Sequence, residues 1–252
     1  MKKKITILLT CAGGDLSVQN IKLFKKSKVY EKINIIGVDT KKTVVAKYFL
    51  DKYYQVPATQ SSRFIKVIKK IIKDNHIDLI LAGSDEESLV LTKLFSNIKN
   101  IKVANSNYVT LKILSNKIRT YEELEKNKIQ TPLWSEIRNL KDLKKKFKFF
   151  KMKKINFCIK PAISRGGRDV YIIDDSLSKK VYFQNSREIH LNSKIFFKEA
   201  IKYLKRKFPL MIMERLKGPV YDLDILSDKG KLITAVVRKR INSALPNEGH
   251  LI

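Results

Sequence analysis

Short apolar runs alternate with amphipathic stretches along the first hundred residues. Continuous runs rich in Ile, Leu and Val predict buried strands at 4–10, 33–39, 77–83 and 101–105. Helical spacing predicts a helix in the segment 17–27 and another at 62–74, the latter with one apolar face made of Phe64, Ile65, Ile68, Ile71 and Ile72. This order of strands and helices is typical of a doubly wound α/β domain with a parallel sheet.

The turn after the first strand is the first candidate for chemistry. Gly13 and Gly14 follow that strand directly, and the first helix follows them. Ligands bind at such turns because backbone N–H groups and a helix N-terminus gather there. The spacing G-x-G-x-x-G is absent, so a tight strand–helix turn remains an open alternative. Asp39 ends the second strand, where it could hold a hydroxyl group. Acids open a further helix at 85–87, as the helix dipole prefers.

The second half of the chain has a different pattern. A helical stretch is predicted at about 108–128, and a Lys-rich helix at 141–154 with a solvated face. Residues 176–208 are expected to be mostly helical near their end. The predicted strands can pair antiparallel, so this half is an α+β domain; they lie at 155–161, 170–174 and 210–214, with a hairpin around the turn 227–230. The domains are therefore expected at 1–107 and 108–252.

The net charge of the chain is large, but it adds little to the predicted function. The 252 residues hold 53 Lys and Arg against 24 Asp and Glu, a net charge of +29. Only 10 of those cations are Arg, the residue that nucleic-acid binders use for bidentate contacts. The excess of Lys is typical of a codon bias, so no specific nucleic acid is expected as a partner, although any polyanion is favoured.

The cellular compartment is predicted from three features that the sequence lacks: a membrane span, a signal peptide and a disulfide scaffold. No apolar run reaches the roughly 18 residues of a membrane span. The first residues are a strand followed by a glycine turn, unlike a signal peptide. Cys11 and Cys158 are the only cysteines, which argues against a disulfide scaffold. His76, His190 and His250 have no metal-ligand spacing and are expected at the surface. A cytoplasmic protein that does not bind membranes is therefore predicted.

The strongest motif is FCIKPAISRGGRDV at 157–170. It brings Lys160 to a strand end and follows it with a glycine-containing loop at 164–168. An ammonium group beside such a loop suits phosphate, because it neutralises charge while glycine allows a close backbone approach. A surface hairpin beside a solvated lysine is the alternative. No Walker loop is present.

Further segments agree with this motif in order and spacing. SNKIRTYEELEKNKIQTPLW contains Lys117 at the start of a helix, and MIMERLKGPVYDLDIL and VVRKR lie downstream. Together they resemble the ATP-grasp superfamily, in particular the branch like the large subunit of carbamoyl phosphate synthetase. The resemblance implies a Rossmann-like pre-ATP-grasp domain, an ATP-grasp domain, and ATP with Mg²⁺ as cofactors.

The resemblance also implies roles for individual residues. Lys117 and Lys160 match lysines that hold ATP phosphates, and the loop with Ser164, Gly166 and Gly167 matches the glycine flap that closes over them. Glu214 matches the acid that receives the adenine amino group, and the backbone of Arg215, Leu216 and Lys217 lines the adenine slot. Met211 and Met213 would pack on the purine or simply fill the strand core. Asp222 could contact the ribose, and Arg238 and Arg240 match basic positions that face phosphates or the acyl substrate and are taken as catalytic.

The sequence departs from the family at two points. Val220 stands where many members have an acid before the tyrosine at 221. The late acid followed by an E-x-N segment, which holds the metal in the family, has no counterpart here, so no metal ligand is assigned. On this ground the ATP-grasp part is expected to be incomplete.

These observations leave three hypotheses for the function. The first is an ATP-dependent ligase that joins an unknown carboxylate to an amine or similar nucleophile through an acyl phosphate. The second is a nucleotide-binding module without catalysis. The third, nucleic-acid binding through the net charge, ranks last because the basic residues are spread along the chain. The oligomeric state is not predicted.

Overall fold

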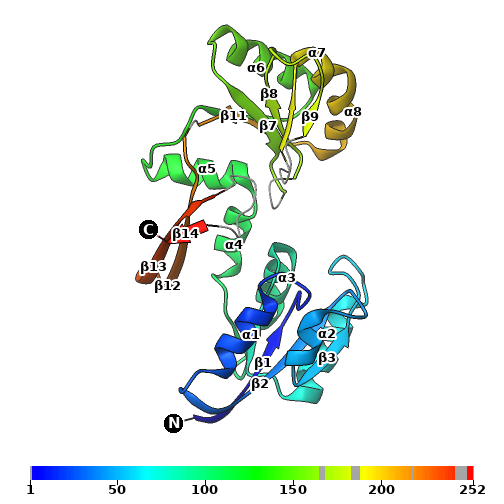
Figure 1. Ribbon diagram of the computed structural model, residues 1–252, viewed down its shortest axis with the longest axis vertical. Coiled ribbons are helices and arrows are strands. Elements are labelled where there is room, and N and C mark those ends of the chain that lie inside the picture. Colours follow the sequence, from blue (N-terminus) through cyan, green and yellow to red (C-terminus); the bar gives the residue numbers. More distant parts are fainter. Residues whose placement is uncertain (1, 165–167, 183–187, 217, 242–248, 252) are drawn as a thin grey trace. The chain divides into compact units, whose positions relative to one another are not determined.

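The structure, a computed structural model, divides the chain into two compact units, Met1–Lys112 and Ile113–Ile252 (Figure 1). It describes residues 2–164, 168–182, 188–216, 218–241 and 249–251. Within those ranges no helix is long and apolar enough to cross a membrane. The domain boundary between residues 107 and 108 stays a prediction.

The first unit contains a parallel sheet of five strands in the order β3-β2-β1-β4-β5. The strands are β1 (Lys2–Leu9), β2 (Tyr30–Asp39), β3 (Lys52–Gln55), β4 (Leu79–Leu81) and β5 (Lys102–Val103). The four predicted strands are thus confirmed, although β4 and β5 are shorter than their apolar runs. The short edge strand β3 was not predicted. The strand order reverses between β1 and β4, the place where ligands bind in open α/β sheets.

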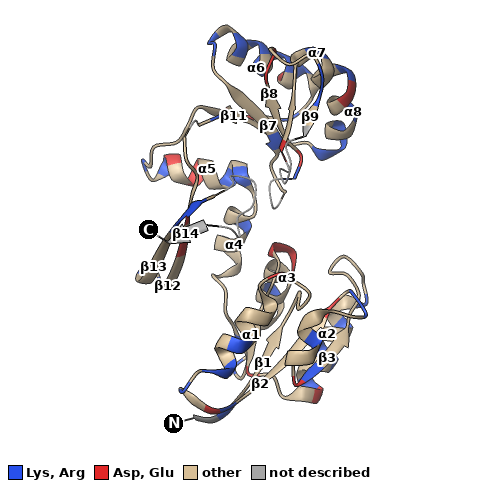
Figure 2. Ribbon diagram, in the orientation of Figure 1, with Lys and Arg blue, Asp and Glu red and all other residues tan. Residues whose placement is uncertain are grey.

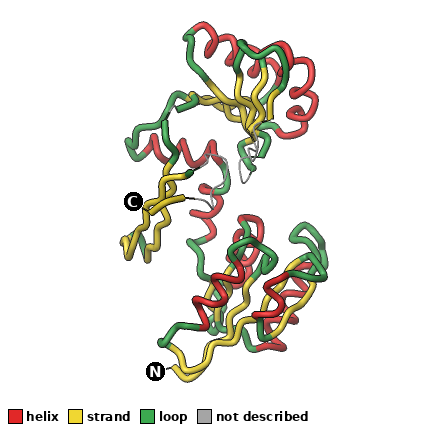
Figure 3. Tube along the Cα trace, in the orientation of Figure 1, coloured by secondary structure: helices red, strands yellow, loops and turns green. Residues whose placement is uncertain are grey.

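Helices cover both faces of this sheet. On one face, α2 (Phe64–Asn75) and α3 (Asp85–Phe95) form a core with residues such as Leu8, Ile36 and Ile80. On the other face, α1 (Ser17–Lys25) and the 3-10 helix η1 (Val45–Phe49) pack around Leu9 and Ile35. Figure 3 shows the alternation of helices and strands that the sequence pattern predicted. One detail was wrong, because Ile65 is 38% exposed and lies outside the buried face of α2.

The second unit contains a mixed sheet of six strands in the order β6-β11-β7-β8-β10-β9. They are β6 (Trp134–Ile137), β7 (Phe157–Pro161), β8 (Val170–Ile173), β9 (Val181–Tyr182), β10 (Glu188–Leu191) and β11 (Leu210–Glu214). Strands β10 and β8 run parallel, and the other neighbours run antiparallel. The sequence did not predict β9 and β10, which lie in a Lys- and Asn-rich segment expected to be helical only near its end.

Helices cover one face of this second sheet. They are α6 (Leu140–Met152) and a continuous run of α7 (Ser193–Ile195), the π-helical η2 (Phe196–Ala200), α8 (Ile201–Leu204) and the 3-10 helix η3 (Lys205–Lys207). Their buried side chains form the largest core together with Phe157, Ile159 and Ile212 from the strands. Lysines lie along the outside of α6 (Figure 2), as the prediction of a solvated helix face requires.

The helical stretch predicted at 108–128 is two helices, α4 (Tyr108–Leu114) and α5 (Lys117–Lys126). The break has a local cause, since the side chain of Asn116 accepts hydrogen bonds from the backbone N–H groups of Ile118 and Arg119. An N-cap of this kind starts a new helix and satisfies donors that a continuing helix would use otherwise. The cap places Lys117 at the first position of α5.

The predicted hairpin is confirmed as β12 (Tyr221–Asp228) and β13 (Lys231–Arg240), and β14 (Gly249–Leu251) pairs with β13. Lys229 and Gly230 form the turn with φ of +48° and +79°. Two positive φ values match the type I′ turn, whose twist suits neighbouring strands. The apolar side chains of this hairpin are largely exposed, among them Leu223, Ile225 and Ile233.

Candidate functional site

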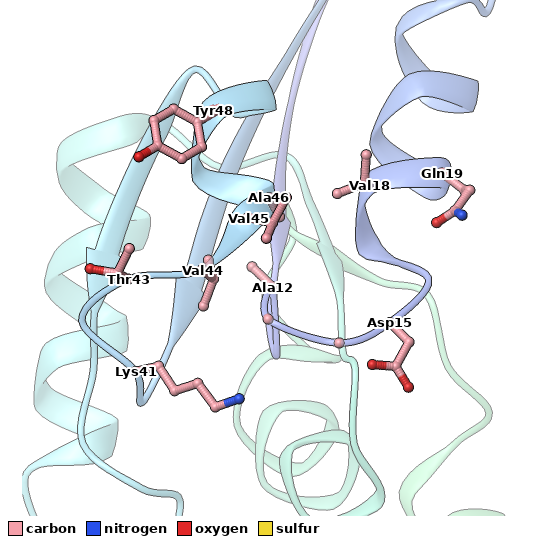
Figure 4. A pocket seen from close by; sticks show the side chains of 12 residues that line it. Ala12, Asp15, Val18, Gln19, Lys41, Thr43, Val44, Val45, Ala46 and Tyr48 are labelled. Carbon is pink, nitrogen blue, oxygen red and sulfur yellow. The ribbon is translucent and has the colours of Figure 1, made fainter.

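A cavity of about 600 Å³ lies in the first unit beside the turn after β1. Gly13, Gly14 and the start of α1 form one wall, and the segment between β2 and β3 forms the other. Figure 4 shows Asp15 on one wall and Lys41 on the other, with the apolar side chains of Ala12, Val44 and Ala46 between them. The cavity thus offers one carboxylate, one ammonium group and an apolar lining.

Asp39 holds the glycine turn in place. Its Oδ2 atom accepts a hydrogen bond of 2.8 Å from the N–H of Gly13. A Cβ at Gly13 would lie 2.9 Å from the same Oδ2 atom and 2.8 Å from Cγ1 of Val44, so only glycine fits this approach. In this structure the carboxylate of Asp39 accepts hydrogen bonds from backbone N–H groups. That it also holds a hydroxyl group of a ligand stays a prediction.

A buried carboxylate lies behind this turn. Glu87 is 6% exposed, and its Oε2 atom accepts hydrogen bonds from the hydroxyl of Thr10 at 2.6 Å and from the thiol of Cys11 at 2.9 Å. The Thr10 hydroxyl in turn accepts from the N–H of Gly83 at 3.0 Å. Glu87 is therefore more than a partner of the helix dipole, because it ties the ends of β1 and β4 together.

This network determines the chemistry of Cys11. Burial and the neighbouring Glu87 raise the pKa of the thiol to about 12. At pH 8 only about one thiol in 10,000 is then ionised, and the thiolate is the reactive form. We expect iodoacetamide to modify Cys11 very slowly at pH 8 and about tenfold faster for each pH unit up to pH 10. Mass spectrometry of the peptide after timed labelling measures this. Labelling as fast as that of a free thiol at pH 8 would contradict the assignment.

In the second unit, Lys117 lies against Ser164, the first residue of the loop predicted at 164–168. The Nζ atom of Lys117 donates to the backbone oxygen of Ser164 at 2.7 Å and to its hydroxyl at 3.0 Å. The backbone N–H of Lys117 also donates to the oxygen of Ala162 at 2.9 Å. The start of α5 is therefore fixed to the segment that follows β7, and two predicted site residues that are far apart in the sequence, Lys117 and Ser164, meet in space. Gly166 and Gly167 lie outside the described residues.

Lys160 lies on β7 and is half-buried. It belongs to the sheet face opposite α6, because side chains two positions apart on a strand share a face and Cys158 packs there. Met211 and Met213 lie on this face too, buried with Ile118 of α5 and with Cys158. The packing shows that both methionines are part of the core on this face of the sheet. Their contact with a purine stays a prediction.

The end of β11 carries the residues proposed to recognise adenine. Glu214 forms two hydrogen bonds with Leu133, the residue before β6. Its N–H donates to the backbone oxygen of Leu133 at 2.7 Å, and its Oε2 accepts from the N–H of Leu133 at 3.3 Å. The N–H of Arg215 donates to the oxygen of Asn156 at 2.8 Å. Leu216 is 67% exposed, and Lys217 lies outside the described residues.

The charged residues of the hairpin pair with one another. Arg240 forms a bidentate ion pair with Asp222, with N···O distances of 2.7 and 2.6 Å. Arg238 pairs with Asp224 at 2.8 Å. Arg240 lowers the pKa of Asp222, so this carboxylate stays ionised well into the acidic range. In this structure Asp222 is thus bound to an arginine, and its proposed contact with ribose remains untested.

One polar residue of this unit was misjudged from the sequence. His190 was expected at the surface but is 7% exposed, because β10 places it on the same sheet face as Cys158 and Ile172. Its Nε2 atom lies 3.5 Å from Oε2 of Glu188, and Nη2 of Arg215 lies 4.0 Å from the same oxygen. Glu188 was not singled out at all. The alternation E-I-H-L in residues 188–191 was the available signal for a strand.

The family resemblance implies a nucleotide and Mg²⁺ at this site, and both can be compared with the residues present. Lys117, Lys160 and Arg215 supply the cationic side chains that nucleotide phosphates require, so the described residues fit a nucleotide. Among them no three His, Cys, Asp or Glu side chains come together in a way that could hold a metal ion. No step of a reaction is therefore assigned to Mg²⁺.

Comparison with known proteins shows one family match and several solved structures with the same fold. Residues 7–106 match the family described as PylC-like, N-terminal domain. A search of curated proteins found no match. Several solved structures share the fold over almost the whole chain but are 12–15% identical in sequence.

Three of these structures illustrate the match. N5-carboxyaminoimidazole synthetase from Staphylococcus aureus, complexed with ADP, has a TM-score of 0.63 at 12% identity, with 94% of this chain and 56% of that chain covered. L-amino acid ligase from Bacillus licheniformis has a TM-score of 0.65 at 14% identity, with 100% and 55% covered. The biotin carboxylase domain of 2-oxoglutarate carboxylase from Hydrogenobacter thermophilus has a TM-score of 0.65 at 15% identity, with 95% and 52% covered.

The predicted fold class is therefore confirmed: a Rossmann-like α/β domain precedes a domain with the mixed sheet of the ATP-grasp fold. The chain spans about half the length of the solved structures that it matches.

Proposed function

We propose that this chain binds ATP and belongs to an ATP-dependent ligase that joins a carboxylate to an amine or similar nucleophile. The observation that carries the proposal is the meeting of Lys117 with Ser164, which lies three residues after the end of β7, the strand that carries Lys160. Proteins with this fold and such names as L-amino acid ligase support the class of reaction. Assignment to the branch like carbamoyl phosphate synthetase rests on the order of the motifs alone. We place the protein in the cytoplasm.

The proposed chemistry has two steps. A carboxylate oxygen of the substrate attacks the γ-phosphorus of ATP, the bond to the β-phosphate oxygen breaks, and ADP leaves. The nucleophile then attacks the acyl carbon, loses a proton and displaces inorganic phosphate. Lys117 and Lys160 neutralise the charge that develops on the phosphoryl oxygens, since phosphoryl transfer is catalysed mainly by positioning and electrostatics. Arg238 and Arg240 would face the phosphates or the acyl group once they exchange their aspartate partners.

The cavity beside Gly13 and Gly14 is the proposed place for the acceptor substrate. It provides room for a small metabolite, and its opposite charges, Lys41 and Asp15, can hold a polar molecule by both ends. The N–H groups at the start of α1 add a partial positive charge for an anionic group.

Isothermal titration of the chain with ATP, ADP and adenosine tests the first part of the proposal. We expect ATP and ADP to bind at one site and adenosine to bind at least about tenfold more weakly, because Lys117 and Lys160 are proposed to contact phosphates. Failure of ATP to bind would overturn the proposal. An assay for ADP release in the presence of single carboxylic acids then tests the reaction. Saturable ATP binding with no ADP release from any acid would favour the nucleotide-binding module without catalysis.

A further inference from the structure

The sheet face that carries Lys160 also carries two residues of strand β10, which lies between β8 and β9. Across the sheet, Met213 pairs with Cys158, Cys158 with Ile172, and Ile172 with His190. Paired residues on neighbouring strands share a face, and so do residues two positions apart on one strand. Glu188, two positions before His190, therefore lies on the face of Lys160.

Glu188 is an acid among cations on this face. Its Oε2 atom lies 4.0 Å from Nη2 of Arg215. Lys160, Arg215 and Glu188 all act electrostatically on the thiol of Cys158, so the three charges lie near one buried side chain. The carboxylate thus lies in the positive field that the proposed function assigns to phosphates.

His190 fixes the position of this carboxylate without cancelling its charge. Its Nε2 atom lies 3.5 Å from Glu188, and its ring is buried against the sheet. Burial and the nearby Arg215 lower the pKa of His190, although Glu188 and Asp174 act in the opposite direction. A neutral imidazole at neutral pH can donate a hydrogen bond to Glu188 without adding a positive charge beside it.

We propose that Glu188 is an internal counter-ion of the nucleotide site, which holds Arg215 and offsets the charge of Lys160 until nucleotide phosphates replace it. This inference rests on the proposed function. Glu188 then acts as a positioning residue that sets how strongly the site prefers phosphorylated nucleotides over nucleosides. Phosphate must compete with a carboxylate that is already bound to the chain, so Glu188 weakens binding of ATP and leaves binding of adenosine unaffected.

Glu188→Gln tests this, because it removes the charge and keeps the size of the side chain. We expect the affinity for ATP in isothermal titration to rise about threefold to tenfold, with affinity for adenosine unchanged. The thermal midpoint should confirm that the variant is folded. Glu199→Gln is the matched control, because Glu199 is exposed on η2, the helical layer packed on the opposite face of the sheet. It should leave both affinities unchanged.

A double variant distinguishes the effect of Glu188 on Arg215 from its effect on Lys160. In an Arg215→Met background, Glu188→Gln should raise the ATP affinity less than it does alone, because only the field of Lys160 is then released. Unchanged or weaker ATP binding by Glu188→Gln, or an equal rise for adenosine, would overturn the inference while leaving the proposed function intact. Absence of ATP binding by the unaltered chain would overturn both.

Discussion

Replacement of Lys160 by alanine is expected to weaken ATP binding by about tenfold to a hundredfold. A hydrogen bond to a charged group contributes about 1.5–3 kcal/mol, and the loss also leaves phosphate oxygens without a partner in a half-buried place. Adenosine should bind as before, because the ammonium group is proposed to contact phosphate only. Isothermal titration of the variant with ATP and adenosine measures the difference.

The high net charge of the chain makes a control variant necessary. With a charge of +29, loss of any lysine can lower the general attraction for a polyanion. Lys145→Ala removes the same charge from the exposed side of α6. We expect it to change ATP affinity by less than about twofold at 0.15 M salt, where exposed charges are screened. Equal losses in Lys145→Ala and Lys160→Ala would mean that Lys160 has no specific contact with the nucleotide.

Replacement of Phe150 by alanine is expected to destabilise the second unit by about 3–5 kcal/mol. Phe150 is fully buried in the core under α6 and packs against Phe157, with ring centroids 5.5 Å apart. Loss of the ring leaves a cavity that the surrounding strands cannot fill. Denaturant unfolding followed by tryptophan fluorescence measures the change, since the only tryptophan, Trp134, lies in β6 of the same sheet.

The neighbouring residue provides a control at the same place in the chain. Phe149 lies on α6 as well but is 44% exposed. Phe149→Ala should cost less than about 1 kcal/mol, because nearly half of the residue already contacts water. Similar losses of unfolding free energy for the two variants would show that the core under α6 is packed differently from this description.

Local patterns predicted the parts of the fold that depend on local interactions. The helix α2 was predicted from the spacing of Phe64, Ile68 and Ile71, which are buried as expected. The hairpin of β12 and β13 was predicted from the turn chemistry around Gly230. In both cases neighbouring residues alone determine the structure, through side-chain periodicity in the helix and through positive φ values in the turn.

Elements that depend on distant partners were missed or misplaced. Strands β9 and β10 are only two and four residues long, and they form because β8 offers an unpaired edge to β10. His190 was predicted at the surface for the same reason, since its burial follows from the pairing of β10 with β8. The helical stretch expected at 108–128 is divided by the cap at Asn116, a signal that the apolar pattern does not contain, although the motif placed Lys117 at the start of a helix.

The sequence by itself determined the order of strands and helices, the two kinds of domain and the resemblance that singles out Lys117 and Lys160. It could do so because these follow from local periodicity and from motifs with a fixed spacing. Only the tertiary structure brought Lys117 to Ser164, bound Asp222 to Arg240 and placed Glu188 and His190 on the face of Lys160. Each of these contacts joins residues whose strands or helices meet through sheet pairing and packing, and the energy of such contacts depends on the whole fold.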